Sequence, residues 1–186
     1  MRLRYSETMA THQSLPNLWL LTDERNDEGL ARSIAALPAG SAIVFRHYHL
    51  SPAQRIARFR AVRHLCRAKG HLIILADSAL TAREWGADGI YGTARALYPA
   101  RKGLLTIATA HTLREIGDAA RMRADAVMLS PVFPTRSHPG EPVLGPLRFR
   151  GLALHAKMPV ITLGGMTIQR ARAMEWPRLA AIDGLS

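Results

Sequence analysis

The chain has 186 residues, of which 48% are hydrophobic, so it can form one domain with a sizeable core. Its 25 Lys and Arg residues outweigh 14 Asp and Glu residues, and the formal net charge of +11 predicts attraction to anions. The arginines are scattered along the whole chain, which argues against a nucleic-acid interface. The apolar runs are far shorter than the roughly 18 residues of a membrane span, so we expect no membrane partner. Cys66 is the single cysteine and cannot form an internal disulfide, which predicts a cytoplasmic protein.

Short apolar segments recur along the whole sequence and predict eight strands. Their runs are continuous rather than alternating, as is typical of parallel strands that are buried on both faces. The predicted strands cover residues 18–21, 42–45, 72–75, 88–91, 104–108, 126–129, 159–163 and 180–185.

Amphipathic segments with helix signals lie between most of these strands. Ser51 and Gln54 form a capping box with Pro52 at the first helical position, and a second box joins Thr112 and Glu115. Strand and helix therefore alternate, which predicts an α/β fold with a parallel sheet, and eight strands favour a closed (β/α)8 TIM barrel over an open sheet. We expect a flexible N-terminal arm over residues 1–16 and the barrel over residues 17–186, with its last helix truncated.

Two segments are candidates for a binding site. A loop rich in Pro and Gly, Ser130–Pro146, follows the sixth strand at the barrel end that carries active sites. It offers hydroxyl donors at Thr135 and Ser137, next to charged groups at Arg136 and His138. Gly164 and Gly165 follow the seventh strand, where backbone N–H groups could approach an anion beside a helix N-terminus, although a tight turn would also need glycine.

The residues of these segments carry a family resemblance. ADAVMLSPVFPTRSHPGEPVLG, residues 124–145, resembles the loop after strand six of thiamine phosphate synthases, and PVITLGGMT, residues 159–167, resembles the glycine turn of that superfamily, which includes the TenI branch. LWLLTD, GADGIY and TAHTLREI also match, so the resemblance covers about residues 18–186 in order. It implies a TIM barrel of thiamine biosynthesis, either a synthase that joins hydroxymethylpyrimidine diphosphate to thiazole phosphate or a TenI-like thiazole tautomerase.

The resemblance also implies roles for individual residues. Thr135, Ser137, Gly164 and Gly165 match the positions that bind the phosphate of thiazole phosphate or of the product. Arg46, Thr109 and His138 are assigned to substrate or diphosphate binding, and His111 to acid/base catalysis, for which an imidazole is well suited. The residues alone leave alternatives open, because His111 could simply begin a helix and Arg46 could form a structural ion pair.

The chain departs from the synthase pattern where the diphosphate is handled. Synthases carry Gln-x-Arg-x-Lys on the second strand, and here these positions are Val44, Arg46 and Tyr48. The Asn-Asp pair after the third strand is Ala76-Asp77, and GTARALYP after the fourth strand has no carboxylate. The lysine expected in the long loop is His138. Asp77 alone would hold Mg²⁺ weakly, and capping the next helix is its structural alternative.

Three hypotheses follow from these residues. The leading one is a thiamine phosphate synthase/TenI-like barrel that binds thiazole phosphate or thiamine phosphate, with a degenerate diphosphate and Mg²⁺ site and TenI-like acid/base chemistry at His111 left open. The second is an active thiamine phosphate synthase that has rebuilt its diphosphate clamp from Arg46, Asp77, Arg95 and His138, and the third is a non-catalytic basic binding module. Fold analogy does not choose among them, and a homo-oligomer stays open.

Overall fold

The computed structural model describes residues 15–99, 102–137, 140, 142–183 and 185. In these residues eight parallel strands form a closed barrel in chain order, and β8 closes it by pairing with β1. The predicted TIM barrel is therefore confirmed. The strands are β1 (Leu18–Leu21), β2 (Ala42–Phe45), β3 (Leu72–Leu75), β4 (Gly89–Thr93), β5 (Leu105–Ala110), β6 (Ala126–Leu129), β7 (Val160–Thr162) and β8 (Leu179–Ala181).

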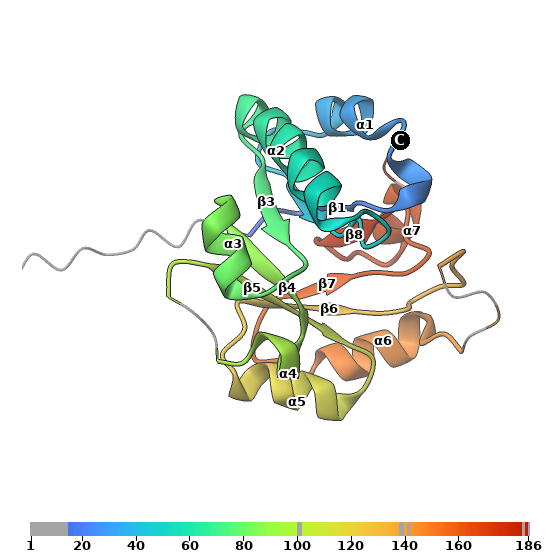
Figure 1. Cartoon of the computed structure of the whole chain (residues 1–186). Coiled ribbons are helices and arrows are strands. Elements are labelled where there is room, and N and C mark those ends of the chain that lie inside the picture. The colour runs from blue at the N-terminus through green and yellow to red at the C-terminus, as the bar shows by residue number, and fades with distance from the viewer. Residues whose placement is uncertain (1–14, 100–101, 138–139, 141, 184, 186) are drawn as a thin grey trace, which may run out of the picture.

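Helices connect the strands and cover the outside of the barrel. Figure 1 shows α1 and α2 on one side of the strands and α4, α5 and α6 on the opposite side. No helix follows β8 in the part of the chain that the structure describes. The helical segments are the 3-10 helix η1 (Glu24–Asn26), α1 (Leu30–Ala36), α2 (Pro52–Lys69), α3 (Ala79–Trp85), α4 (Ala94–Leu97), α5 (Leu113–Arg121), α6 (Gly145–Ala153) and α7 (Ile168–Ala173).

The strands are buried on both faces, which explains their continuous apolar runs. Side chains on one face, such as those of Trp19, Val44 and Ile74, fill the barrel interior. Those on the other face, such as Ile43 and Ile73, pack against the surrounding helices. Cys66 belongs to this outer layer, and burial raises the pKa of its thiol to about 12, so it acts in packing rather than in chemistry.

Local signals set the helix boundaries much as the sequence predicts. Pro52 opens α2, and the Ser51 N–H donates to Gln54 Oε1 at 3.2 Å. At α5 the Glu115 N–H donates to Thr112 Oγ1 at 3.3 Å. The long loop is shorter than predicted, because α6 already begins at Gly145.

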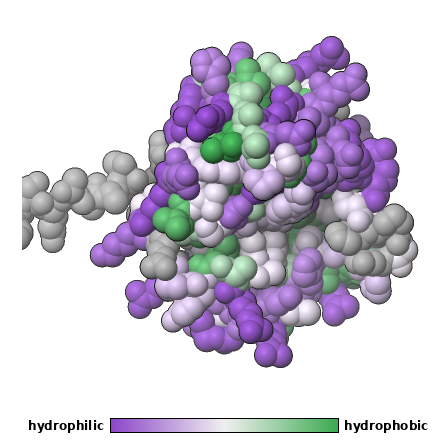
Figure 2. All heavy atoms as spheres, viewed as in Figure 1, coloured by the Kyte–Doolittle hydropathy of each residue, from purple (hydrophilic) through white to green (hydrophobic). Residues whose placement is uncertain are grey.

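The chain ends and the surface complete the fold. Most of the predicted arm lies outside the described residues, but Leu15 packs against the barrel interior and the Pro16 carbonyl accepts a hydrogen bond from Trp19 Nε1 at 2.7 Å. Figure 2 shows hydrophilic side chains over most of the visible face, with small hydrophobic patches between them. Within the described residues, no helix has the length and apolar character to cross a membrane.

Candidate functional site

A cavity of about 560 Å³ opens at the carboxyl ends of the strands. The sequence-predicted residues Arg46, Thr109, His111, Thr135, Ser137, Gly164 and Gly165 all line it, whereas Asp77 does not. His138 lies outside the described residues. The other lining residues are Tyr91, Ser130, Pro131, Pro134, Arg136, Leu163, Met166, Thr167, Arg170, Ala181, Ile182 and Asp183.

The glycine turn after β7 forms one wall of the cavity. Gly164 and Gly165 have φ angles of 90° and 60°, which disfavour residues with a side chain. A Cβ atom at Gly165 would lie 2.4 Å from the Pro134 carbonyl oxygen, so the turn must be glycine to pack against the loop after β6. The Gly164 carbonyl accepts from the Phe133 N–H at 3.0 Å. None of the hydrogen bonds between described residues uses the N–H groups of the two glycines, which leaves donors for a ligand beside the cavity.

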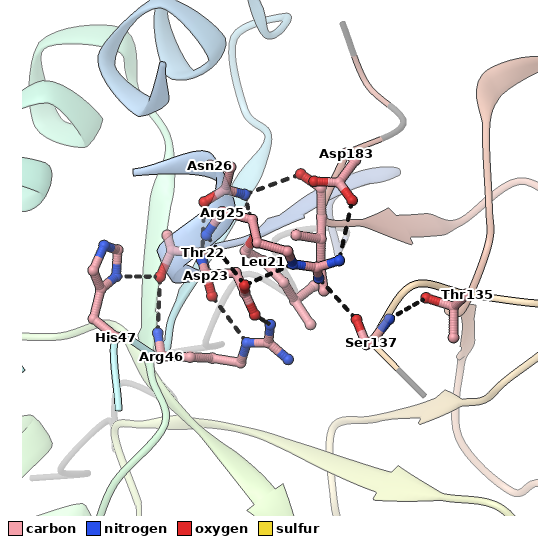
Figure 3. A network of polar contacts seen from close by, with 11 residues as sticks. Leu21, Thr22, Asp23, Arg25, Asn26, Arg46, His47, Thr135, Ser137 and Asp183 are labelled. Carbon is pink, nitrogen blue, oxygen red and sulfur yellow. Dashed lines mark hydrogen bonds and ion pairs between the residues drawn. The ribbon is translucent and has the colours of Figure 1, made fainter. Parts of the chain in front are cut away.

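The loop after β6 brings hydroxyl groups to the same wall. Thr135 Oγ1 accepts from the Ser137 N–H at 3.3 Å, which orders this part of the loop. Ser137 Oγ in turn accepts from Arg25 Nη2 at 2.9 Å, so the loop is tied to the segment after β1 (Figure 3). The structure thus brings together the four residues that the sequence assigns to a phosphate.

Arginine and aspartate side chains alternate across the cavity mouth. Arg25 Nε lies 2.9 Å from Asp23 Oδ1, and its Nη1 lies 3.5 Å from Asp183 Oδ2. Arg136 Nη2 also reaches Asp183 Oδ2, at 3.0 Å. Arg46 Nη2 lies 2.6 Å from Asp23 Oδ2. Arg25, Arg46 and Arg136 therefore each have a carboxylate partner within the protein, and an anionic ligand would compete with these carboxylates. Figure 3 shows the pairs of Arg25 and Arg46.

Four of the residues at this mouth were missed by the sequence reasoning. Arg25 follows β1, Tyr91 lies on β4, Arg170 lies on α7 and Asp183 follows β8. Burial raises the pKa of the Tyr91 hydroxyl to about 12, so the group is a neutral hydrogen-bonding partner on the cavity wall. The signal that could have found most of these residues is their position at or just beyond the carboxyl end of a strand.

His111 lines the cavity from the end of β5 with a defined ring orientation. Its Nδ1 lies 2.7 Å from the Ser130 carbonyl oxygen, which can only accept, so Nδ1 carries a hydrogen and Nε2 is the ring nitrogen that this bond does not use. The His111 N–H donates to Glu115 Oε2 at 2.7 Å. Although burial opposes it, hydrogen bonds from the backbone of His111 and from Thr112 lower the pKa of Glu115, which stays a carboxylate.

Asp77 is committed to a different partner. Its Oδ2 accepts from Arg55 Nη1 at 2.5 Å, and its Oδ1 accepts from the Ser78 N–H at 2.7 Å. Burial works in the opposite direction, yet these hydrogen bonds lower its pKa. The cap of α3 is Ser78 rather than Asp77, because Ser78 Oγ accepts from the Thr81 N–H.

The residues present do not fit the Mg²⁺ site that the family resemblance implies. Both oxygens of Asp77 are engaged, one of them by a cation, and the described residues hold no group of three His, Cys, Asp or Glu that could bind a metal ion. Mg²⁺ needs oxygen ligands that are free to reach it. Asp77 as a weak metal ligand stays a prediction.

The chain is similar in sequence to known proteins of one family. The sequence pattern of the family described as "Thiamine monophosphate synthase" matches residues 18–176. The chain is 29% identical over 174 residues to a thiamine-phosphate synthase of Azoarcus sp. (strain BH72), which covers 87% of this chain and 84% of that protein. It is 30% identical over 182 residues to a thiamine-phosphate synthase of Chloroflexus aurantiacus, which covers 91% of this chain and 82% of that protein.

A solved structure agrees with the fold. The thiamine phosphate pyrophosphorylase from Pyrococcus furiosus superimposes with a TM-score of 0.73, covering 90% of this chain and 85% of that chain at 24% identity. At this identity the likeness supports the barrel and not the residue roles.

Proposed function

Because the chain belongs to the thiamine monophosphate synthase family, we propose that its cavity binds thiazole phosphate or thiamine phosphate by the phosphate group, with the synthase reaction weakened or lost. The ligand's phosphate would lie against the glycine turn after β7 and the hydroxyl groups of Thr135 and Ser137. Its ring would then extend toward Thr109 and His111 within the same cavity.

One observation carries this proposal, namely that two parts of the site differ in their unused hydrogen-bonding groups. The phosphate wall is formed by Thr135, Ser137, Gly164 and Gly165, and the diphosphate wall is the region of Asp77 after β3. At the phosphate wall, no hydrogen bond between described residues uses the N–H groups of Gly164 and Gly165. At the diphosphate wall, Asp77 is neutralised by Arg55 and lies outside the cavity lining. A phosphate monoester therefore finds donors, whereas a diphosphate with its metal ion does not find the expected carboxylates.

The chemistry of the synthase explains why this difference matters. Departure of a diphosphate from the pyrimidine requires groups that neutralise the growing negative charge, and such groups supply much of the rate enhancement. Val44, Tyr48 and Ala76 offer no charge at positions where the family pattern has polar groups. We therefore propose that this step is slow in the present chain.

His111 supports a second reaction at the same site. A tautomerase needs one proton carrier next to an anchored substrate, and Nε2 of His111 would be the acceptor on the cavity wall while Nδ1 is held by Ser130. The base would take a proton at Nε2 from one carbon of the thiazole tautomer and return it to another carbon of the same conjugated system while the double bonds shift, with no net loss or gain of protons. If the protein catalyses a reaction at this site, we therefore propose an isomerisation of the TenI type.

Thermal unfolding with matched ligands tests the phosphate contact. A ligand at about 100 times its Kd stabilises a protein by about 2.7 kcal/mol, or roughly 5 to 10 °C in Tm for a chain of this length. We expect thiamine phosphate to give a shift of this size and thiamine a much smaller one. Equal shifts from the two compounds would contradict the proposal.

An active synthase is the second candidate, and the arginines at the cavity mouth are the observation that favours it. Arg25, Arg46 and Arg136 could replace the missing lysine if Asp23 and Asp183 released them. Mixing hydroxymethylpyrimidine diphosphate with thiazole phosphate and measuring thiamine phosphate decides between the candidates.

A non-catalytic basic module would instead bind polyanions with an affinity that falls steeply with salt. The cytoplasmic location stays a prediction.

A further inference from the structure

A chain of hydrogen bonds runs from α2 to the cavity through two buried side chains. Thr22, just after β1, and His47, just after β2, are 0% and 1% exposed. Thr22 Oγ1 lies 2.6 Å from His47 Nδ1, and His47 Nε2 lies 2.7 Å from Asp27 Oδ1. Asp27 Oδ1 also accepts from Arg58 Nε of α2 at 2.8 Å. At the other end Thr22 contacts Arg46, which lines the cavity (Figure 3).

The partners fix the direction of every bond in this chain. Although burial opposes it, hydrogen bonds from His47 and Arg58 lower the pKa of Asp27, which therefore accepts as a carboxylate. Burial lowers the pKa of His47, so its ring is neutral near pH 7. With Nε2–H donating to Asp27, Nδ1 is an acceptor and the Thr22 hydroxyl must donate to it.

Thr22 in turn holds Arg46 at two points. Its Oγ1 accepts from the Arg46 N–H at 3.0 Å, and its carbonyl accepts from Arg46 Nε at 2.9 Å. Because the Thr22 hydroxyl proton is directed at His47, a lone pair of Oγ1 is left facing the Arg46 N–H. The bond to His47 therefore fixes the orientation of the Thr22 hydroxyl group, whose oxygen accepts from Arg46.

The backbone at His47 is unusual in the same place. Its φ of 38° is in the left-handed region, which costs a residue with a side chain on the order of 1 to 2 kcal/mol. The turn carries the imidazole back over the Phe45 ring, at a centroid distance of 4.6 Å and an interplanar angle of 12°. The strained turn allows two successive residues to diverge, with Arg46 at the cavity and His47 in the interior.

We propose that His47 is a positioning residue that acts through Thr22 to hold the Arg46 guanidinium in place for an anionic ligand. Thr22 itself is no nucleophile despite its Thr–His–Asp arrangement, because it is fully buried and does not line the cavity. The inference rests on the proposed function and adds Arg46, which lines the same cavity, to the contacts of the ligand. The link from His47 to Arg46 can be tested without any ligand.

Two variants test the two ring nitrogen atoms of His47 one at a time. In His47→Asn the amide oxygen lies near the position of Nδ1 and can accept from Thr22, whereas the bond to Asp27 is lost. In His47→Gln the amide nitrogen reaches the position of Nε2 and can donate to Asp27, whereas Thr22 loses its acceptor. Both remove the stacking on Phe45, so both should lower Tm. Thr22→Val removes the hydroxyl group and serves as the matched control.

The first measurement is the NMR signal of the Arg46 backbone N–H, which donates to Thr22 Oγ1, in the ligand-free protein. We expect a slowly exchanging signal in the wild type and in His47→Asn, because the Thr22 hydroxyl keeps its acceptor and Oγ1 still accepts from Arg46. In His47→Gln and Thr22→Val the signal should broaden or exchange rapidly. An unchanged signal in His47→Gln would overturn the positioning role.

The second measurement is the Kd of thiamine phosphate by calorimetry. We expect His47→Asn to bind within about threefold of the wild type and His47→Gln to bind about tenfold more weakly, the size of one hydrogen bond. Losses of affinity that follow the losses of Tm in both variants would overturn the proposal in favour of a purely structural role. A wild type that binds no thiamine phosphate, but shows the expected NMR differences, would contradict the proposed function and leave the positioning role supported.

Discussion

The two sides of the barrel mouth use their polar groups in opposite ways. On the side of β6 to β8, the carbonyls of Gly164 and Gly165 accept hydrogen bonds within the protein, whereas no hydrogen bond between described residues uses their N–H groups. On the side of β2 to β4, Asp77 is bonded to Arg55, and Arg55 also lies over the rings of Tyr48 and Trp85 at 5.7 and 5.5 Å. Asp77, the carboxylate that the family resemblance assigns to Mg²⁺, is therefore bonded within the protein on this side.

On the proposed function, this difference would be how a binding site loses one function and keeps another. A phosphate wall made of backbone N–H groups depends on glycine and on close packing, so substitution is resisted by steric clash. A wall made of charged side chains can change one residue at a time, because a carboxylate such as Asp77 is stabilised by any cation within reach, here Arg55. Binding of a phosphate monoester can thus outlast synthase chemistry in the same barrel.

The largest expected effect is on catalysis at His111, between the two sides. If the protein isomerises a thiazole carboxylate phosphate, His111→Gln should lower the rate by about 10² to 10⁴, because the variant removes the proton carrier. Binding of thiamine phosphate, measured by calorimetry, should stay within about threefold of the wild type, since the phosphate wall is untouched. A variant that loses binding and rate together would mean that His111 contacts the ligand as an anchor instead.

Much of the fold could be predicted from the sequence, because local signals and the final structure agree. Continuous apolar runs mark strands buried on both faces, and capping residues such as Thr112 mark helix starts. The end of the eighth strand was less predictable. Its apolar run begins at Ala180 and continues to Leu185, whereas β8 pairs with β1 over Leu179–Ala181.

The candidate site could be predicted only where the required backbone conformation leaves a mark in the sequence, such as a pair of glycines. Gly164 and Gly165 are visible as a pair after a strand, and the structure shows why they must be glycine. Arg25 and Asp183 gave no such mark, because their pairing joins positions that are far apart in the chain. Asp77 was visible as a carboxylate, but its partner Arg55 lies on α2 and is known only once the barrel brings the two together.

A change at the glycine turn should have the next largest effect. Gly165→Ala places a Cβ atom 2.4 Å from the Pro134 oxygen at a φ of 60°, so we expect a loss of stability of about 2 to 4 kcal/mol, or roughly 5 to 15 °C in Tm. Binding of thiamine phosphate should be lost even well below the new Tm. Gly151→Ala on α6 is the matched control, because a Cβ there meets nothing within 4 Å and should raise Tm slightly. A Gly165→Ala protein as stable and as tightly bound as the wild type would refute the packed turn.

A smaller effect is expected at Asp77 on the opposite side. Its pKa is lowered in the folded protein, so its contribution to stability is present above the unfolded value of 3.8 and is lost as the pH falls through the folded value. Asp77→Asn should therefore lower the stability by about 1 kcal/mol at pH 7, and the difference from the wild type should shrink below about pH 4. Binding of thiamine phosphate should not change.

The matched control for this change is Asp118→Asn, whose partner Arg121 is far more exposed. It should alter the stability at pH 7 by less than about 0.5 kcal/mol, because exposed pairs are screened by water. Urea unfolding at several pH values measures both variants. If the Asp77 variant loses thiamine phosphate binding at pH 7, the carboxylate belongs to the ligand site and the contrast between the two sides fails.

The smallest expected effect is that of Mg²⁺ on the ligand-free protein. With both oxygens of Asp77 engaged, binding should be weak, and 1 mM Mg²⁺ at a Kd on the order of 10 mM would stabilise the fold by only about 0.06 kcal/mol. Tm should therefore shift by less than about 0.5 °C, in the wild type and in Asp77→Asn alike. A tight site found by calorimetry would contradict this expectation and move attention to the cavity mouth, where Asp23 and Asp183 carry carboxylates now paired with arginine. If Asp77→Asn then abolished the tight binding, the bond from Arg55 must open for the metal, and the β2 to β4 side would be a working part of the site rather than part of the packing.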